Sequence, residues 1–365
     1  MQPNQRNASL DVLRILAFLF VVGVHACLEG GFYYLRVTGP AIIPWIVLRV
    51  IFMCCVPLFM MLSGYLTLDK TWDRAYYLRL GRVVFVYVAA CLVCRGYQCW
   101  YYQEAPDVKE LFFDILDFDA APYSWYVQMY LGLALLFPFF NVLWKGLDSQ
   151  KKHRALVWSL VILTTLPSLL NTYNLSVADW WKHPSTSDEY QLLISDWWQC
   201  LYPVTYYFLG AYLKTYPPQK RPWQYALGGV GAVAVFGAYN VYRSWGSGFV
   251  WAGFNEYYGF QSLLVSWLIF AFWLRVPCQR LPQWARRALG ILSPLTLGAY
   301  LVSWCFDQWL YPALESHFYP IAQRFAYYPL CIAISAIGSL AVSALIQLAW
   351  LGLQKLIHLP FLKKR

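Results

Sequence analysis

Long apolar stretches follow one another along the chain, separated by short polar segments. Stretches of about 20 apolar residues are typical of helices that cross a bilayer. Ten occur, at 10–29, 42–67, 80–102, 124–144, 155–173, 199–214, 224–243, 257–276, 289–311 and 328–354. The pattern shows no fixed-period repeat and no long polar linker. We therefore predict one all-α polytopic membrane domain over residues 1–365, a bundle of about ten transmembrane helices.

The composition excludes a soluble globular protein. Hydrophobic residues make up 60% of the chain and charged residues only 13%, whereas a soluble domain is about 25% charged. A soluble fold has no place for this much apolar surface, and a bilayer accepts it. Most of the ten cysteines lie inside the apolar runs, where a thiol behaves as a small hydrophobe. We expect no metal site.

The distribution of charge predicts the orientation of the bundle. With the N-terminus inside and ten alternating spans, the inner side carries 21 of the 28 Lys and Arg residues but only 4 of the 18 Asp and Glu residues. This asymmetry follows the positive-inside rule and predicts that both termini are cytoplasmic. The net charge of +10 is then explained by topology and by attraction to anionic membrane lipid, without a nucleic-acid partner.

Four ionisable residues share one face of the first predicted helix. Arg14 and His25 are eleven residues apart, about 20° from three full turns and roughly 16 Å along the axis. Asp11 lies three residues before Arg14, and Glu29 lies four residues after His25, on the same face. Ionisable groups at such depth mark functional paths in the bundle interior. Simpler interpretations are an interfacial ion pair for Asp11 and Arg14, an interhelical hydrogen bond for His25 and an ordinary surface acid for Glu29.

Further candidates lie on other segments. Arg79 and Arg82 are one turn apart at the start of the third span, and paired guanidiniums suit phosphate groups; they also serve the positive-inside rule. Trp180 and Trp197 each follow an aspartate on the predicted outer side. Such rings could stack on a sugar or belong to the interfacial aromatic belt.

Seven short motifs occur in the same order as in a known family. They are Asp11-x-x-Arg14, Arg14-x10-His25, Phe59 through Ser63-Gly64, Arg79-x-x-Arg82, Trp125-Tyr126 with Tyr130 and Pro138, Phe208-Leu209-Gly210, and Ser293 through Tyr300-Leu301. In these motifs the chain resembles the acyltransferase 3 family of bacterial membrane O-acyltransferases, from Asp11 to about Trp350. It departs from that family at Ser303, where many members carry a histidine.

The resemblance implies a membrane O-acyltransferase of the bacterial cytoplasmic (inner) membrane. It implies transfer of an acyl group, commonly acetyl, from cytoplasmic acetyl-CoA or another acyl-CoA to a hydroxyl of an extracytoplasmic or lipid-linked glycan. His25 would act as general base or as acyl carrier, assisted by Glu29, Arg14 and Asp11. Phosphates of coenzyme A would meet Arg79, Arg82 and Arg14. The residues expected at the sugar are Trp125, Tyr130, Trp180 and Trp197.

Two other functions fit part of the pattern. A secondary transporter or a glycan-lipid flippase would also place Arg, His and Glu inside the membrane, although the chain lacks an evident two-half repeat. An acyltransferase-like sensor without activity would explain Ser303. Intact Arg14 and His25 argue against the sensor, and binding of acyl-CoA would argue against the transporter.

Overall fold

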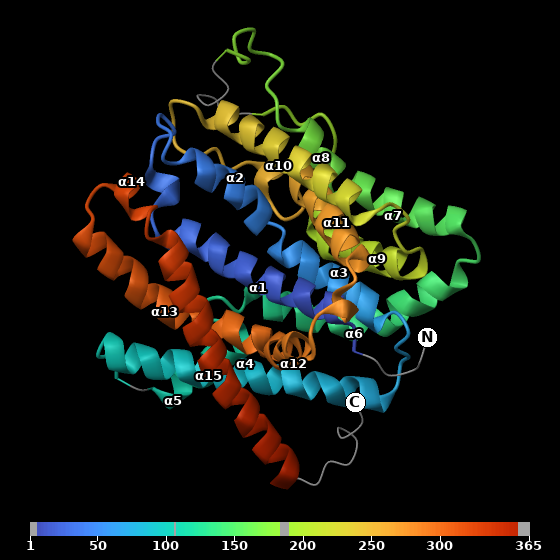
Figure 1. The fold of residues 1–365 in the computed structure, drawn as a ribbon, viewed down its shortest axis with the longest axis vertical. Helices are drawn as coiled ribbons and strands as arrows, with labels where there is room; N and C mark the ends of the chain where they lie inside the picture. The colour runs from blue at the N-terminus through green and yellow to red at the C-terminus, as the bar shows by residue number, and fades with distance from the viewer. Residues whose placement is uncertain (1–5, 106, 183–189, 357–365) are drawn as a thin grey trace.

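The computed structural model describes residues 6–105, 107–182 and 190–356 (Figure 1). The α-helices in these ranges are α1 (Ala8–Glu29), α2 (Ile43–Phe52), α3 (Cys55–Thr67), α4 (Arg74–Tyr101), α5 (Val108–Asp117), α6 (Trp125–Gly146), α7 (Gln150–Thr164), α8 (Leu166–Leu170), α9 (Tyr202–Thr215), α10 (Pro222–Ser244), α11 (Phe260–Arg275), α12 (Gln283–Leu292), α13 (Thr296–His317), α14 (Ile321–Arg324) and α15 (Tyr328–Leu356). Short 3-10 turns join several of them, and the described ranges contain no β-strand.

Eight helical segments of the described ranges are long and apolar enough to cross a membrane. They are Ala8–Glu29, Ile43–Thr67, Arg74–Tyr101, Trp125–Gly146, Pro222–Ser244, Gly253–Arg275, Gln283–His317 and Tyr328–Lys355. The stretches predicted at 155–173 and 199–214 fold as the shorter helices α7, of 15 residues, and α9, of 14 residues. At 1.5 Å per residue each is about 22 Å long, less than a 30 Å hydrocarbon core. The helical membrane bundle is confirmed, whereas ten spans and cytoplasmic termini stay predictions.

Three of the predicted stretches are interrupted rather than continuous. In 155–173, α7 ends at Thr164 and α8 begins at Leu166. The other two are 42–67 and 289–311. Stretch 42–67 breaks between α2 and α3, and stretch 289–311 breaks at the 3-10 turn Ser293–Leu295 between α12 and α13. Pro57 lies in the first turn of α3, and Pro294 lies in that 3-10 turn. Proline has no N–H to donate and is tolerated where a helix begins, so both breaks fall where a helix restarts.

Helix α1 lies at the centre of the bundle. It packs against α2, α3, α11, α12, α13 and α15, and Figure 1 shows it between the α2–α3 segment and α13. Fourteen of its 22 residues are buried. A helix that is apolar on nearly all sides is stable only when other apolar surfaces surround it. Its few ionisable side chains therefore point into protein.

Helices α3 and α9 approach each other closely at two glycines. A Cβ atom added to Gly64 of α3 would overlap the carbonyl oxygen of Tyr207 on α9, and one added to Gly210 of α9 would overlap the carbonyl oxygen of Met61 on α3. Small residues let membrane helices pack backbone to backbone. The Ser-Gly and Phe-Leu-Gly motifs of the sequence thus meet at one crossing, between α3 and α9.

Candidate active site

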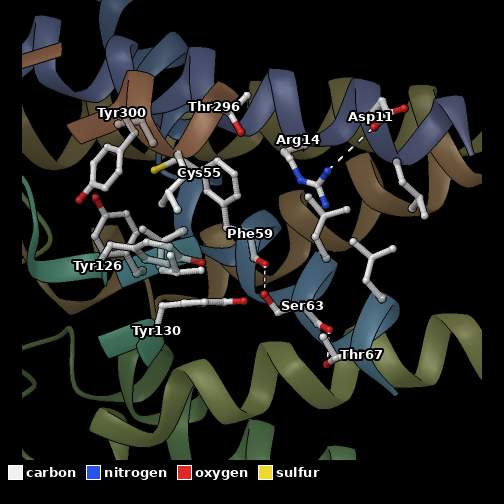
Figure 2. A pocket seen from close by; sticks show the side chains of 18 of the residues that line it. Asp11, Arg14, Cys55, Phe59, Ser63, Thr67, Tyr126, Tyr130, Thr296 and Tyr300 are labelled. Carbon is white, nitrogen blue, oxygen red and sulfur yellow. Dashed lines mark hydrogen bonds and ion pairs between the residues drawn. The ribbon is translucent and has the colours of Figure 1, made fainter. Parts of the chain in front are cut away.

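A cavity of about 940 Å³ follows α1 along much of its length. Its walls come mainly from α1, α3, α6 and α13, with Tyr257 contributed from the connection before α11. Arg14 and His25 both line it. Figure 2 shows Asp11 and Arg14 toward one end and Tyr126 and Tyr300 toward the other. The cavity therefore joins the guanidinium and the imidazole of the first helix in a single space.

The cavity end near the start of α1 is rich in positive charge. Arg6, Arg14 and Lys70 line it together with the carboxylate of Asp11. Both Nε and Nη2 of Arg6 donate to Asp11, at 2.6 and 2.9 Å, so one arginine already satisfies this carboxylate. Arg14 lies 3.9 Å from Asp11. This end of the cavity therefore carries three cationic side chains and one carboxylate.

The side chain of Arg14 also contacts Ser293, in the 3-10 turn between α12 and α13. Its Nη1 donates to the Ser293 hydroxyl at 2.9 Å. Asn7 caps α1 by accepting a hydrogen bond from the backbone N–H of Ser9. The cap fixes where α1 begins, and Ser293 orients a guanidinium that would otherwise have many rotamers. Both contacts fix the positions of groups at this end of the cavity.

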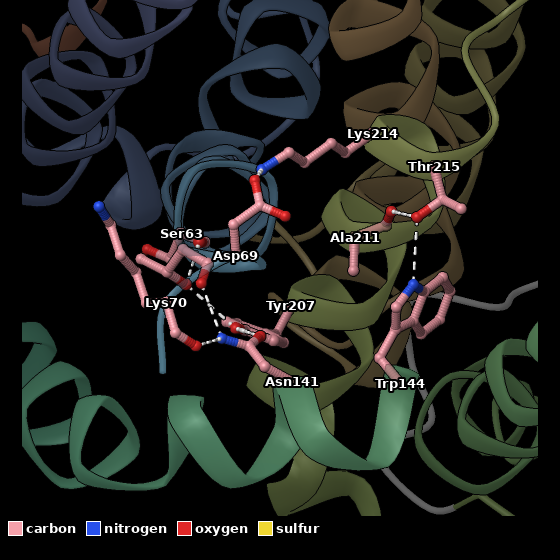
Figure 3. Close-up of polar contacts among 10 residues, drawn as sticks. Ser63, Asp69, Lys70, Asn141, Trp144, Tyr207, Ala211, Lys214 and Thr215 are labelled. Carbon is pink, nitrogen blue, oxygen red and sulfur yellow. Dashed lines mark hydrogen bonds and ion pairs between the residues drawn. The ribbon is translucent and has the colours of Figure 1, made fainter. Parts of the chain in front are cut away.

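The floor of the same end is the last turn of α3, which α6 and α9 hold in place (Figure 3). The side-chain amide of Asn141 donates to the carbonyl oxygens of Thr67 and Lys70, at 2.7 and 2.8 Å, and the Tyr207 hydroxyl donates to Asn141 at 2.7 Å. Lys214 of α9 pairs with Asp69. Carbonyls at a helix C-terminus lack partners within the helix, so this network caps α3 and positions Lys70.

His25 lies at the other end, nearly buried, with 7% of its surface exposed. Its ring packs on the ring of Tyr123, with centroids 3.6 Å apart. The Nδ1 atom has no hydrogen-bond partner and lies 3.8 Å from Oδ2 of Asp307. A buried nitrogen without a partner is unusual in a folded protein and calls for an explanation.

Asp307 of α13 is the site residue that the sequence interpretation missed. It is fully buried, its Oδ1 accepts a hydrogen bond from Ser335 at 2.8 Å, and its Oδ2 accepts one from Tyr123 at 3.2 Å. A signal was present, because Asp307 is an acid inside the predicted stretch 289–311. Ser303, one turn earlier, bonds to the carbonyl oxygen of Tyr300 on its own helix at 2.8 Å and does not line the cavity.

Glu29 was expected to orient the imidazole, and its contacts are with other residues. Its Oε1 accepts a hydrogen bond from Tyr123 at 3.2 Å, and its Oε2 accepts one from Gln308 at 3.3 Å. The carboxylate within ion-pair distance of His25 belongs to Asp307 instead. Glu29 is therefore connected to His25 through Tyr123, whose hydroxyl lies between the two carboxylates.

Arg79 and Arg82 do not line the cavity. Arg82 donates to the side chain of Gln347 at 2.8 Å and to the carbonyl oxygen of Pro294 at 3.2 Å, while Arg79 is exposed on α4. The two guanidiniums were expected to hold phosphates together with Arg14. The structure gives Arg14 the neighbours Arg6 and Lys70 in the cavity and places the Arg79–Arg82 pair outside it.

The four predicted aromatic residues fall into two groups. Trp125 and Tyr130 line the cavity, and Trp125 stacks on Tyr257 with ring centroids 5.6 Å apart. Trp180 is buried against the guanidinium of Arg243, 4.7 Å from its ring centroid, and Trp197 is 85% exposed. Trp180 and Trp197 are therefore not part of this cavity. Within the described ranges, no cluster of three or more His, Cys, Asp or Glu side chains could hold a metal ion.

Comparison with known proteins identifies one family. The family model described as "Acyltransferase domain" matches residues 7–344 of the 365. Searches of curated proteins and of solved structures found no match. The matched segment contains every residue that lines the cavity except Arg6.

Proposed function

The chain belongs to this acyltransferase family, and on that premise we propose that it transfers an acyl group, normally acetyl, from acyl-CoA to a hydroxyl of an extracytoplasmic or lipid-linked glycan. The observation that supports the proposal is one cavity with cations at one end and a buried imidazole at the other. A thioester donor has the same layout, because its phosphates and its reactive carbonyl lie at opposite ends of a long thin arm.

The donor would enter from the Arg14 end. Arg14, Arg6 and Lys70 line that end, and guanidinium and ammonium groups bind phosphate oxygens through charge-assisted hydrogen bonds. Arg79 and Arg82, outside the cavity, remain proposed contacts for the part of coenzyme A that the cavity does not hold. This donor path requires the start of α1 to face the cytoplasm, as the distribution of charge predicts.

His25 would act as the general base. An imidazole can accept a proton near neutral pH, and general-base catalysis contributes about 10²–10⁴-fold to a rate. His25 removes the proton of the acceptor hydroxyl, whose oxygen forms a bond to the thioester carbon. The C–S bond then breaks, and the leaving thiolate takes the proton back. A transient acyl-histidine is the alternative route, in which the imidazole itself attacks the thioester.

The acceptor would reach His25 from the opposite side of the membrane. Trp125, Tyr130 and Tyr257 line the cavity, and the rings of Trp125 and Tyr257 stack. Such rings combine an apolar body with a polar tip, which suits a sugar ring. We propose the bacterial cytoplasmic membrane as the location. The donor is then on the cytoplasmic side, and the glycan is on the other side or attached to lipid.

Two measurements test the proposal. Purified protein in lipid nanodiscs should bind acetyl-CoA in calorimetry, with free coenzyme A and empty nanodiscs as controls. Mass spectrometry of surface glycans should show one acyl group fewer in a deletion strain than in the wild type, restored by the wild-type gene. A glycan that changes location but not mass, together with no binding of acyl-CoA, would instead indicate a transporter or flippase.

A further inference from the structure

Asp307 is an acidic side chain buried inside a membrane-spanning segment, where a charged group is unfavourable. It lies on α13, within a segment of 35 residues that is apolar enough to span a membrane, and it is 0% exposed. An ionisable side chain at such a position is retained only when partners stabilise it or when it performs a function. The contacts of its two oxygens therefore decide what it can do.

The hydrogen bonds to Asp307 come from neutral donors. Ser335 donates to Oδ1 at 2.8 Å and Tyr123 donates to Oδ2 at 3.2 Å. Among the described residues, the group within 4 Å of this carboxylate that can carry a positive charge is His25, with Nδ1 3.8 Å from Oδ2. In the part of the chain that the structure describes, the Asp307 carboxylate has no arginine or lysine partner, and the nearby Nδ1 of His25 has no hydrogen-bond partner. Each of these two buried groups could therefore satisfy the other.

We infer that Asp307 is the positioning residue for His25. It accepts the Nδ1–H of the imidazole, and this selects the tautomer in which Nε2 is free to take a proton from the acceptor hydroxyl. It also stabilises the imidazolium that forms during transfer, as the acid of a catalytic triad does. The inference rests on the proposed function, in which His25 is the base. The 3.8 Å separation is longer than a hydrogen bond, and catalytic contacts of this kind shorten when substrate binds.

The proton balance needs no further co-reactant. The proton moves from the acceptor oxygen to Nε2 of His25 and from Nε2 to the sulfur of the leaving coenzyme A, while Asp307 neither gains nor loses a proton. Asp307 therefore acts through His25 and does not contact the reacting atoms.

The geometry favours Asp307 over Glu29 for this role. Both carboxylates face the single hydroxyl of Tyr123, at 3.2 Å each, and that hydroxyl has one proton to donate. Glu29 is partly exposed and takes a second hydrogen bond from Gln308, whereas Asp307 is buried and lies beside the ring of His25. Glu29→Gln is therefore the matched control, because it neutralises a carboxylate bonded to the same tyrosine.

The test measures kcat and KM for acetyl-CoA and for glycan extracted from a deletion strain, in Asp307→Asn and Glu29→Gln, each alone and combined with His25→Ala. We expect Asp307→Asn to lower kcat by roughly 10²–10⁴-fold with both KM values unchanged, the upper end being the loss seen when the acid of a catalytic triad is neutralised. Glu29→Gln should lower kcat by a much smaller factor. In the His25→Ala background, Asp307→Asn should cause no further loss, because it acts only through the imidazole.

Several results would overturn the inference. One is that Asp307→Asn lowers kcat by the same factor in the wild-type and His25→Ala backgrounds, and another is that it changes only KM. Either result would show that Asp307 has a structural role. Asp307→Glu keeps the carboxylate and should recover part of kcat relative to Asp307→Asn; equal impairment of these two variants would also contradict it. A wild-type protein that transfers no acyl group would instead disprove the proposed function, and the inference with it.

Discussion

Two regions of the molecule each contain a buried histidine packed against an aromatic ring. In the α6–α7–α9 region, His153 lies 3.9 Å from the ring of Trp144, and in the α1–α13 region, His25 lies 3.6 Å from the ring of Tyr123. Their exposed fractions are 6% and 7%. Burial and ring contact therefore do not distinguish the two histidines.

Hydrogen bonding does distinguish them. One ring nitrogen of His153 bonds with Tyr216 and the other with the carbonyl oxygen of Trp144, both at 2.9 Å. His25 leaves Nδ1 without a partner and lines the cavity. Buried polar atoms normally have hydrogen-bond partners, and those of His153 do. A buried ring nitrogen without a partner, next to a cavity, is the exception that suggests a role beyond stability. Each test below therefore compares two residues of the same type, one that lines the cavity and one that does not.

The largest expected effect is the loss of transfer on substitution of His25. His25→Ala removes the proposed base and should lower the transfer rate by about 10²–10⁴-fold. His153→Ala changes a side chain that does not line the cavity and should transfer at a rate close to the wild type. The measurement is turnover of acetyl-CoA by purified protein in nanodiscs, normalised to folded protein. Comparable turnover in the two variants would remove the distinction between the histidines.

Stability should show the opposite ranking. His153→Ala removes two hydrogen bonds and leaves the Trp144 carbonyl and the Tyr216 hydroxyl without that partner, at an expected cost of about 2–3 kcal/mol. His25→Ala removes a ring with no partner at Nδ1 and should destabilise less. Thermal unfolding in detergent, followed by tryptophan fluorescence, would measure the difference. A lower Tm for His25→Ala than for His153→Ala would contradict this assignment of roles.

Arginines provide the next matched pair. Arg14→Ala removes a guanidinium that lines the cavity and should raise the KM for acyl-CoA roughly 10-fold, the loss expected for one hydrogen bond to a charged group. Arg79→Ala changes an exposed side chain outside the cavity and should raise that KM by a smaller factor. Steady-state kinetics at saturating acceptor would compare them. The reverse ranking would place the phosphates outside the cavity, along α4.

Much of this arrangement follows from local pattern. Apolar length predicted the helices, and the eleven-residue spacing predicted that Arg14 and His25 would lie on one face of the first helix. Both are properties of a single helix, set by its rise and rotation per residue. They hold whatever the surrounding helices do, which is why the sequence alone was enough for them.

The partners of those residues depend on packing between distant segments. Asp307 is 282 positions after His25, and the partners of Arg82 lie more than 200 positions away, at Pro294 and Gln347. No periodicity states which helix faces α1, so the sequence predicted Glu29, one turn away on the same helix, in the role that we propose for Asp307. Stretches 155–173 and 199–214 were predicted as full spans for a similar reason. Their apolar composition does not indicate that the helices inside them end after 15 and 14 residues.

The smallest expected effect concerns the acceptor and compares two tryptophans. Trp125 lines the cavity and stacks on Tyr257, whereas Trp197 is 85% exposed and lies outside it. An aromatic contact is worth about 0.5–1.5 kcal/mol, so Trp125→Ala should raise the KM for the acceptor roughly 2- to 10-fold. The KM for acyl-CoA should not change, because the donor enters from the opposite end. Trp197→Ala should leave both values unchanged. If Trp197→Ala raised the KM for the acceptor and Trp125→Ala did not, the glycan would bind at the exposed loop. The aromatic residues of the cavity would then contribute only to packing.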